Sequence, residues 1–86
     1  MTTYVVKFRP RAARQIAKLE SRIRESVLRK AYALALDPRP HGSQKLYGEP
    51  ACYRVRVGAY RIIYEIDDDV RRVEVGTVGH RREVYR

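Results

Sequence analysis

Residues 53–66 alternate apolar and polar side chains on both sides of a central Gly58-Ala59. Alternation at every second position indicates two half-buried β-strands, and a two-residue connection that starts with glycine predicts a type II′ hairpin turn. This register sets Arg56 directly opposite Arg61. One face of the hairpin then carries the predicted core side chains Tyr53, Val55, Val57, Tyr60, Ile62 and Tyr64, and the other carries Arg54, Arg56 and Arg61.

This grouping of arginines predicts an anionic ligand. Like charges directly opposite one another destabilise a sheet, so an anion from outside the chain is the natural compensation. The net charge is +9, and 15 of the 19 basic residues are arginine, the side chain suited to bidentate phosphate contacts. Such a surface favours nucleic acid over an anionic membrane or an acidic protein.

The first half of the chain predicts one strand and two helices. Tyr4, Val6 and Phe8 alternate with Val5 and Lys7, and Pro10 ends this predicted strand. Residues 11–36 then change to a helical period. Ser21 is predicted as an N-cap that divides this region into a short and a longer helix. The buried stripes are predicted to be Ala13, Ile16 and Ala17 on the first helix, and Ile23, Val27, Ala31 and Leu34 on the second.

The second half predicts a loop and further strands. Asp37-Pro38 should end the second helix, and the proline- and glycine-rich residues 37–50 should form a loop with a short edge strand at 44–46. A tight turn at Asp68-Asp69 is expected to begin the last strand. This register places Tyr64 opposite Val73, Ile62 opposite Val75, Tyr60 opposite Thr77, Glu65 opposite Arg72 and Gly76 beside Arg61, and by parity it puts His80 on the face of the arginines.

The order of these elements defines the fold class. One strand, two helices and then further strands predict a single α+β domain over residues 1–86, with a mostly antiparallel sheet packed on a helical hairpin. The opposite face, which carries the arginines, is expected to be concave because sheets twist and coil.

Several classes of chemistry are poorly supported by the residues present. Cys52 is the only cysteine, which excludes an intramolecular disulfide, and it is predicted to be a small packed side chain. The two histidines lie far apart and match no metal-ligand spacing, and no serine stands in a nucleophile elbow. The first ten residues lack the apolar run of a signal peptide, and no segment is apolar enough to span a membrane, so a cytoplasmic protein is expected.

The residues that remain suit cleavage of RNA without a metal ion. Such a reaction needs removal of a proton from a ribose 2′-hydroxyl, cations that stabilise the phosphorane, and an acid for the leaving oxygen. The face that carries Arg54, Arg56 and Arg61 is followed by His80, Arg81, Arg82 and Tyr85, and an aromatic ring such as that of Tyr85 can stack on a splayed base.

Two blocks resemble a known family. Cys-Tyr-Arg-Val-Arg-Val-Gly-Ala-Tyr-Arg-Ile-Ile-Tyr-Glu-Ile at 52–66 and Val-Gly-His-Arg-Arg-Glu-Val-Tyr at 78–85 are similar to the RelE branch of the RelE/ParE toxin superfamily. The resemblance implies the toxin of a type II toxin–antitoxin pair, an endoribonuclease that cleaves messenger RNA in the ribosomal A site without a cofactor. It also implies a partner antitoxin, expected to be RelB-like, acidic and helical.

The resemblance also assigns roles to individual residues. It places the cationic strand of the active site at Arg54 and Arg56, the phosphate-stabilising arginine at Arg61, the proposed general acid at Arg81 and the stacking or proton-transfer tyrosine at Tyr85. Some relatives carry lysines in place of the first two arginines. A guanidinium cannot act as a base, which leaves His80, Tyr85 or water for proton removal.

Two other functions are compatible with the sequence. The ParE branch of the superfamily poisons DNA gyrase and needs no catalytic cluster, and a non-catalytic RNA- or ribosome-binding module would use the same cations. The arginine-bearing face together with the terminal Arg81 and Tyr85 favours the nuclease.

Overall fold

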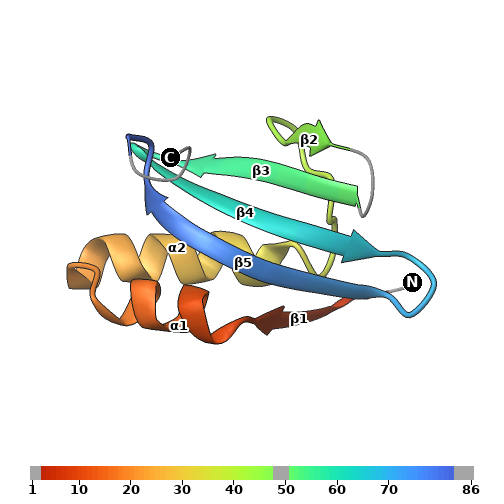
Figure 1. Ribbon diagram of the computed structural model, residues 1–86, viewed down its shortest axis with the longest axis horizontal. Helices are drawn as coiled ribbons and strands as arrows, with labels where there is room; N and C mark the ends of the chain where they lie inside the picture. Colours follow the sequence, from red (N-terminus) through yellow and green to blue (C-terminus); the bar gives the residue numbers. More distant parts are fainter. Residues whose placement is uncertain (1–2, 48–50, 83–86) are drawn as a thin grey trace.

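A computed structural model of the chain describes residues 3–47 and 51–82. The described residues form five strands in one sheet, in the order β1-β5-β4-β3-β2, and both helices lie on the same side of this sheet (Figure 1). We call the side away from the helices the outer face. The elements in chain order are β1 (Val5–Phe8), α1 (Pro10–Ala17), α2 (Ser21–Ala33), β2 (Gln44–Tyr47), β3 (Ala51–Val57), β4 (Tyr60–Asp67) and β5 (Arg72–His80).

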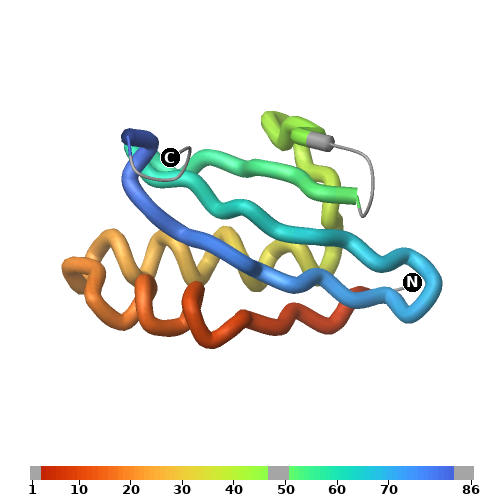
Figure 2. Tube along the Cα trace, viewed as in Figure 1, coloured from red at the N-terminus to blue at the C-terminus, as the bar shows by residue number. Residues whose placement is uncertain are grey.

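The sheet is mostly antiparallel, which confirms the predicted α+β class. Strand β1 pairs in parallel with β5, so that the beginning of the chain lies beside a strand from its end, while the other three pairs are antiparallel (Figure 2). The predicted edge strand is present as β2. No helix in the described ranges is long and apolar enough to cross a membrane.

The core lies between the helices and the inner face of the sheet. The predicted stripe on α2 is confirmed, because Val27, Ala31 and Leu34 are buried and Ile23 packs against them. The stripe on α1 was predicted wrongly in part: Ala12 and Ile16 are buried, whereas Ala13 and Ala17 are exposed. The sheet contributes Val55, Ile62, Tyr64, Ile66, Val73, Val75 and Val78 to the same core.

The helix ends differ from their predicted positions. Pro10 is the first residue of α1, where the missing backbone N–H of proline costs no helical hydrogen bond. The N-cap of α2 is Glu20 and not Ser21, which is the first helical residue and makes no capping bond to the backbone. Helix α2 ends at Ala33, and buried Leu34 follows as its C-cap, before the predicted stop at Asp37.

The β3–β4 hairpin has the predicted register. Val57 pairs with Tyr60, Arg56 with Arg61 and Val55 with Ile62. Gly58 has φ 59°, the left-handed conformation that the first central residue of a type II′ turn requires and that glycine adopts without strain.

The register of β5 against β4 was predicted wrongly, because residues 68–71 connect the two strands in place of the predicted tight turn at Asp68-Asp69. Tyr64 pairs with Val75 and Ile62 with Val78, and the register shifts between these two pairs. Val75 and Val78 are three residues apart, so strict alternation would bury only one of them. The one extra residue of a β-bulge turns both toward the core, where they are 0% and 1% exposed.

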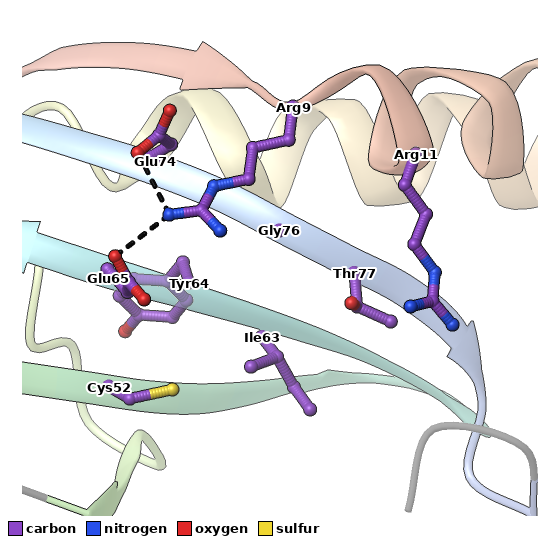
Figure 3. A pocket seen from close by; sticks show the side chains of 9 residues that line it. All are labelled: Arg9, Arg11, Cys52, Ile63, Tyr64, Glu65, Glu74, Gly76 and Thr77. Carbon is purple, nitrogen blue, oxygen red and sulfur yellow. Dashed lines mark hydrogen bonds and ion pairs between the residues drawn. The ribbon is translucent and has the colours of Figure 1, made fainter. Parts of the chain in front are cut away.

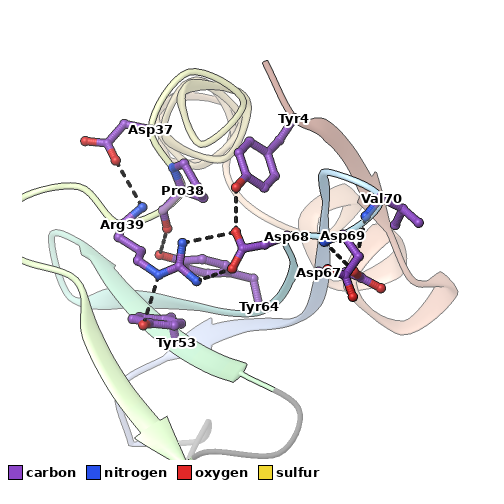
Figure 4. Close-up of polar contacts among 10 residues, drawn as sticks. All are labelled: Tyr4, Asp37, Pro38, Arg39, Tyr53, Tyr64, Asp67, Asp68, Asp69 and Val70. Carbon is purple, nitrogen blue, oxygen red and sulfur yellow. Dashed lines mark hydrogen bonds and ion pairs between the residues drawn. The ribbon is translucent and has the colours of Figure 1, made fainter. Parts of the chain in front are cut away.

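A polar cluster connects the loop after α2 to the end of the sheet that is distant from the β3–β4 hairpin turn (Figure 4). The Arg39 guanidinium donates to both oxygens of Asp68, at 2.8 and 3.3 Å, and to the Tyr53 hydroxyl at 3.1 Å. Hydrogen bonds from Arg39 and from Tyr4 lower the pKa of Asp68. Tyr64 donates to the Pro38 carbonyl at 2.8 Å, and burial raises its pKa to about 12.

Candidate functional site

Three arginines from the hairpin lie on the outer face of the sheet, as predicted. Arg54 and Arg56 come from β3 and Arg61 from β4, at positions that alternate with core residues. We call these three residues the arginine face. Arg56 and Arg61 form a direct cross-strand pair two residues from the hairpin turn, so two like charges are held side by side.

Arg54 is the most buried member of the arginine face, with only 7% of its surface exposed. One of its terminal nitrogens donates to the side-chain oxygen of Gln44 on β2. Its Nε is buried and has no hydrogen-bond partner among the described residues, and no carboxylate in that part of the chain forms an ion pair with it. A buried charge without a counter-charge is costly, so an anion bound beside Arg54 would lower this cost.

A glycine faces Arg61 across the sheet, but it is not the predicted one. The shifted register places Gly79 opposite Arg61, while Gly76 lies at the bulge. Gly79 has no side chain, so it occupies little of the space above Arg61. The glycine that pairs with Arg61 is therefore Gly79, and not the predicted Gly76.

Arg81, which follows β5, lies beside the hairpin turn. The backbone N–H of Arg81 donates to the carbonyl of Ala59 at 2.9 Å, which holds the exposed Arg81 next to the end of the hairpin that carries Arg56 and Arg61. Arg82 is also exposed, and its backbone N–H donates to His80 Nδ1 at 3.3 Å. Tyr85 lies outside the described residues.

His80 does not lie on the arginine face, which corrects the sequence prediction. It pairs with Tyr60, and the two rings meet edge to face with centroids 5.5 Å apart. Tyr60 belongs to the helix side of the sheet, where it lines a hollow together with Ile23 and Ser26 of α2. The bulge inserts one residue and thereby reverses the parity of every later position on β5.

The outer face also carries a second charged group, which the sequence did not reveal. Glu65 and Glu74 pair across β4 and β5, and Arg9 reaches over β5 to bind both, at 3.0 and 3.2 Å (Figure 3). The hydrogen bond to Glu74 and the charge of Glu65 raise the pKa of Arg9. The predicted ion pair of Glu65 with Arg72 is absent, and Arg72 instead lies 3.8 Å from Asp67.

Glycine within an otherwise regular strand was the available signal for the side on which His80 lies, because such a residue often marks a bulge. The pairing of Glu65 with Glu74 is set by the turn, because it lies between the turn and the bulge, and a cation is needed between the two carboxylates. Cys52 is a free, buried thiol, as predicted. Residues 3–47 and 51–82 contain no group of three or more histidine, cysteine, aspartate or glutamate side chains placed to hold a metal ion.

Comparison with known proteins gives consistent results. Residues 6–85 match the family described as the ParE toxin of the type II toxin–antitoxin system parDE. The chain is 35% identical to the mRNA interferase toxin RelE of Escherichia coli, covering 95% of this chain and 90% of that protein. It is 33% identical to Toxin RelG of Mycobacterium tuberculosis, covering 96% and 97% of the two chains.

The fold agrees with solved structures of these toxins. A chain of the toxin–antitoxin complex RelBE2 from Mycobacterium tuberculosis superimposes with a TM-score of 0.81 at 34% identity, over 96% of this chain and 97% of that one. The family model covers nearly the whole sequence, and the similar toxins carry RelE-type names. The chain therefore belongs to the RelE branch of the RelE/ParE superfamily of type II toxins.

Proposed function

We propose that this protein is a ribosome-dependent endoribonuclease that inhibits translation by cutting messenger RNA in the ribosomal A site. The observation that carries the proposal is the arginine face, where buried Arg54 lacks a carboxylate partner among the described residues and Arg56 stands against Arg61. A phosphodiester supplies the missing negative charge. The E. coli relative, named an mRNA interferase, supports the same chemistry.

The proposed reaction is an internal transfer at phosphorus. The ribose 2′-hydroxyl loses its proton, its oxygen forms a bond to phosphorus, and the bond from phosphorus to the 5′-oxygen breaks. The 5′-oxygen takes up a proton, which leaves a 2′,3′-cyclic phosphate and a free 5′-hydroxyl. Cations fixed at the phosphate stabilise the charge that develops in the transition state, and no metal or cofactor takes part in this scheme.

The chain offers residues for phosphate binding, base stacking and protonation of the leaving oxygen, while proton removal has two candidates. Arg61 contacts the scissile phosphate, Arg54, Arg56 and Arg82 hold the RNA backbone, and Arg81 beside the hairpin turn protonates the leaving oxygen. Tyr85 stacks on the base. A guanidinium cannot remove the proton, and His80 lies on the helix side against Tyr60. Proton removal is therefore assigned to Tyr85 or to water.

The partner is proposed to be an antitoxin of the RelB type, acidic and helical. The net charge of +9 favours a partner of opposite charge, because complementary charge speeds encounter and selects against other proteins. The M. tuberculosis structure is of a toxin–antitoxin complex. Co-expression with an adjoining acidic gene product should yield a purified complex without nuclease activity, and a neighbour that neither binds nor restores growth would contradict this assignment.

The function is tested by expressing the chain alone. Growth and translation should stop, and mapping of RNA ends in the arrested cells should show cuts within translated messages. Intact messages together with gyrase–DNA cleavage complexes would identify a ParE-type activity instead. Arrest of translation with uncut messages would identify a non-catalytic ribosome-binding module.

A further inference from the structure

The outer face carries a pocket next to the arginine face. It has a volume of about 250 Å³ and is lined by residues of α1, β3, β4 and β5, with Arg9 at one side and Arg11 at another (Figure 3). Ile63, Gly76 and Thr77 line it from the two central strands, and the bulge makes Gly76 and Thr77 face outward together.

The pocket and the arginine face form one continuous surface. Ile63 pairs directly with Arg54 across β3 and β4, and it lies two residues along β4 from Arg61. Two residues of a strand span about 6.6 Å. A nucleotide chain whose phosphate is bound at Arg61 therefore has the pocket within reach of a neighbouring nucleotide.

The charge of the pocket differs from that of the arginine face. Its two acids, Glu65 and Glu74, balance its two bases, Arg9 and Arg11, so its formal charge is zero. The carboxylates repel a phosphate, whereas the three arginines next to the pocket attract one. A pocket of this size, below the roughly 300 Å³ at which drug-sized sites begin, suits a single neutral planar group.

Three polar side chains of the pocket, Arg9, Glu65 and Glu74, hold one another in place. Arg9 binds Oε1 of Glu65 and Oε1 of Glu74, and this clamp fixes the plane of its guanidinium. A fixed guanidinium plane is a surface on which a splayed base can stack. The Oε2 atoms of the two glutamates make no hydrogen bond to the described residues, and an ionised carboxylate can only accept hydrogen bonds.

We propose that this pocket binds the base of the nucleotide next to the scissile phosphate and prefers a base with an exocyclic amino group. The inference rests on the proposed nuclease function and adds a specificity subsite to it. The amino group of cytosine donates to a carboxylate. Uracil offers only carbonyl oxygens at that position, which the carboxylates repel. Loss of one such hydrogen bond corresponds to a preference of roughly tenfold.

Binding can be measured without any nuclease activity. The purified protein is titrated with cytidine 5′-monophosphate and with uridine 5′-monophosphate while the backbone amide signals of Gly76 and Thr77 are followed by NMR. The cytidine nucleotide should shift both signals with roughly tenfold higher affinity than the uridine nucleotide. Equal affinities, or shifts confined to the arginine face, would overturn the proposal even if the protein cleaves RNA.

A steric substitution tests the pocket during cleavage. A Cβ added at Gly76 would meet no atom closer than 3.9 Å, so Gly76→Leu should fold while it fills the pocket from the strand. Two ribosome-bound messages that differ only in cytidine or uridine beside the cut are compared. The ratio of their cleavage rates, which does not depend on the amount of folded protein, should fall from roughly ten to about one.

The control is Ala33→Leu, which adds the same side chain at an exposed, uncharged position of α2 outside the pocket and should keep the parent ratio. A Gly76→Leu variant that keeps the parent ratio, or a parent protein that shows no preference, would overturn the subsite. A parent protein that cleaves neither message would contradict the proposed function, and the nucleotide titration would then decide whether the pocket binds a base.

Discussion

Two like-charge pairs lie on the outer face of the same sheet, and they differ in the ion pairs that surround them. Glu65 faces Glu74 across β4 and β5, and Arg9 binds both carboxylates. Arg56 faces Arg61 across β3 and β4, and no carboxylate of the described residues forms an ion pair with Arg56 or with the neighbouring Arg54.

We propose that the difference separates a structural charge pair from a functional one. Like charges directly opposite each other cost free energy in both places. The acidic pair is compensated from within the chain, so it contributes to a defined pocket. Arg56 and buried Arg54 have no such carboxylate among the described residues, and we propose that an anion bound from outside compensates their charge.

The largest expected effect comes from Arg61→Ala. If the basic pair exists to bind the scissile phosphate, loss of this contact should lower the single-turnover cleavage rate roughly hundredfold. The fold should persist because the substitution relieves repulsion with Arg56. Circular dichroism and thermal unfolding check the fold, and RNA cleavage on programmed ribosomes checks the rate. A folded variant as active as the parent would show that the arginine face is not the active site.

Arg54→Met should separate activity from stability. Methionine keeps much of the length of the side chain and removes a buried charge that has no carboxylate partner among the described residues. Cleavage should fall about tenfold through loss of positive potential at the phosphate, while the free energy of unfolding should stay unchanged or rise by about 1 kcal/mol. A clear loss of stability in denaturant unfolding would instead make Arg54 a structural residue.

Arg9→Met should have the opposite pattern. It leaves Glu65 and Glu74 facing each other without the bridging cation, so stability at neutral pH should fall by about 0.5 kcal/mol, while Arg61 keeps its place. Protonation of the two carboxylates in acid removes their repulsion, and the difference from the parent should then disappear. Urea unfolding at neutral and acidic pH measures this, and a deficit that does not depend on pH would point to lost packing.

The smallest effect is expected from His80→Gln. His80 lies on the helix side against Tyr60, away from both like-charge pairs. Its removal should change the cleavage rate by less than about twofold and should leave the dependence of that rate on pH unchanged. A rate that falls tenfold or more and loses its pH dependence would return His80 to the mechanism as the base.

Much of the fold was predictable because its signals are local. The alternation of residues 53–66 and the Gly58-Ala59 turn predicted the hairpin and its two faces correctly. The stripe Val27, Ala31 and Leu34 likewise predicted the buried side of α2. The buried face of α1 was predicted only in part because alanines occupy several faces of this helix. A side chain as small as that of alanine is tolerated either in the core or at the surface.

The candidate site was only partly predictable. Arg54, Arg56 and Arg61 follow from one hairpin, so their grouping needs no distant contact. The burial of Arg54 under Gln44 and the clamp of Arg9 on Glu65 and Glu74 join segments far apart in sequence. No local pattern specifies such contacts, because they depend on which strands pair and in which register.

By itself, the sequence determined the hairpin, the helical faces and the arginines that share one surface, because turn chemistry and side-chain periodicity act over a few residues. Only the tertiary structure decided the side on which His80 lies. Val75 and Val78 are both buried because one extra residue is accommodated at Gly76, which strict alternation would not allow. The bulge that results reverses every later side chain on β5, including that of His80.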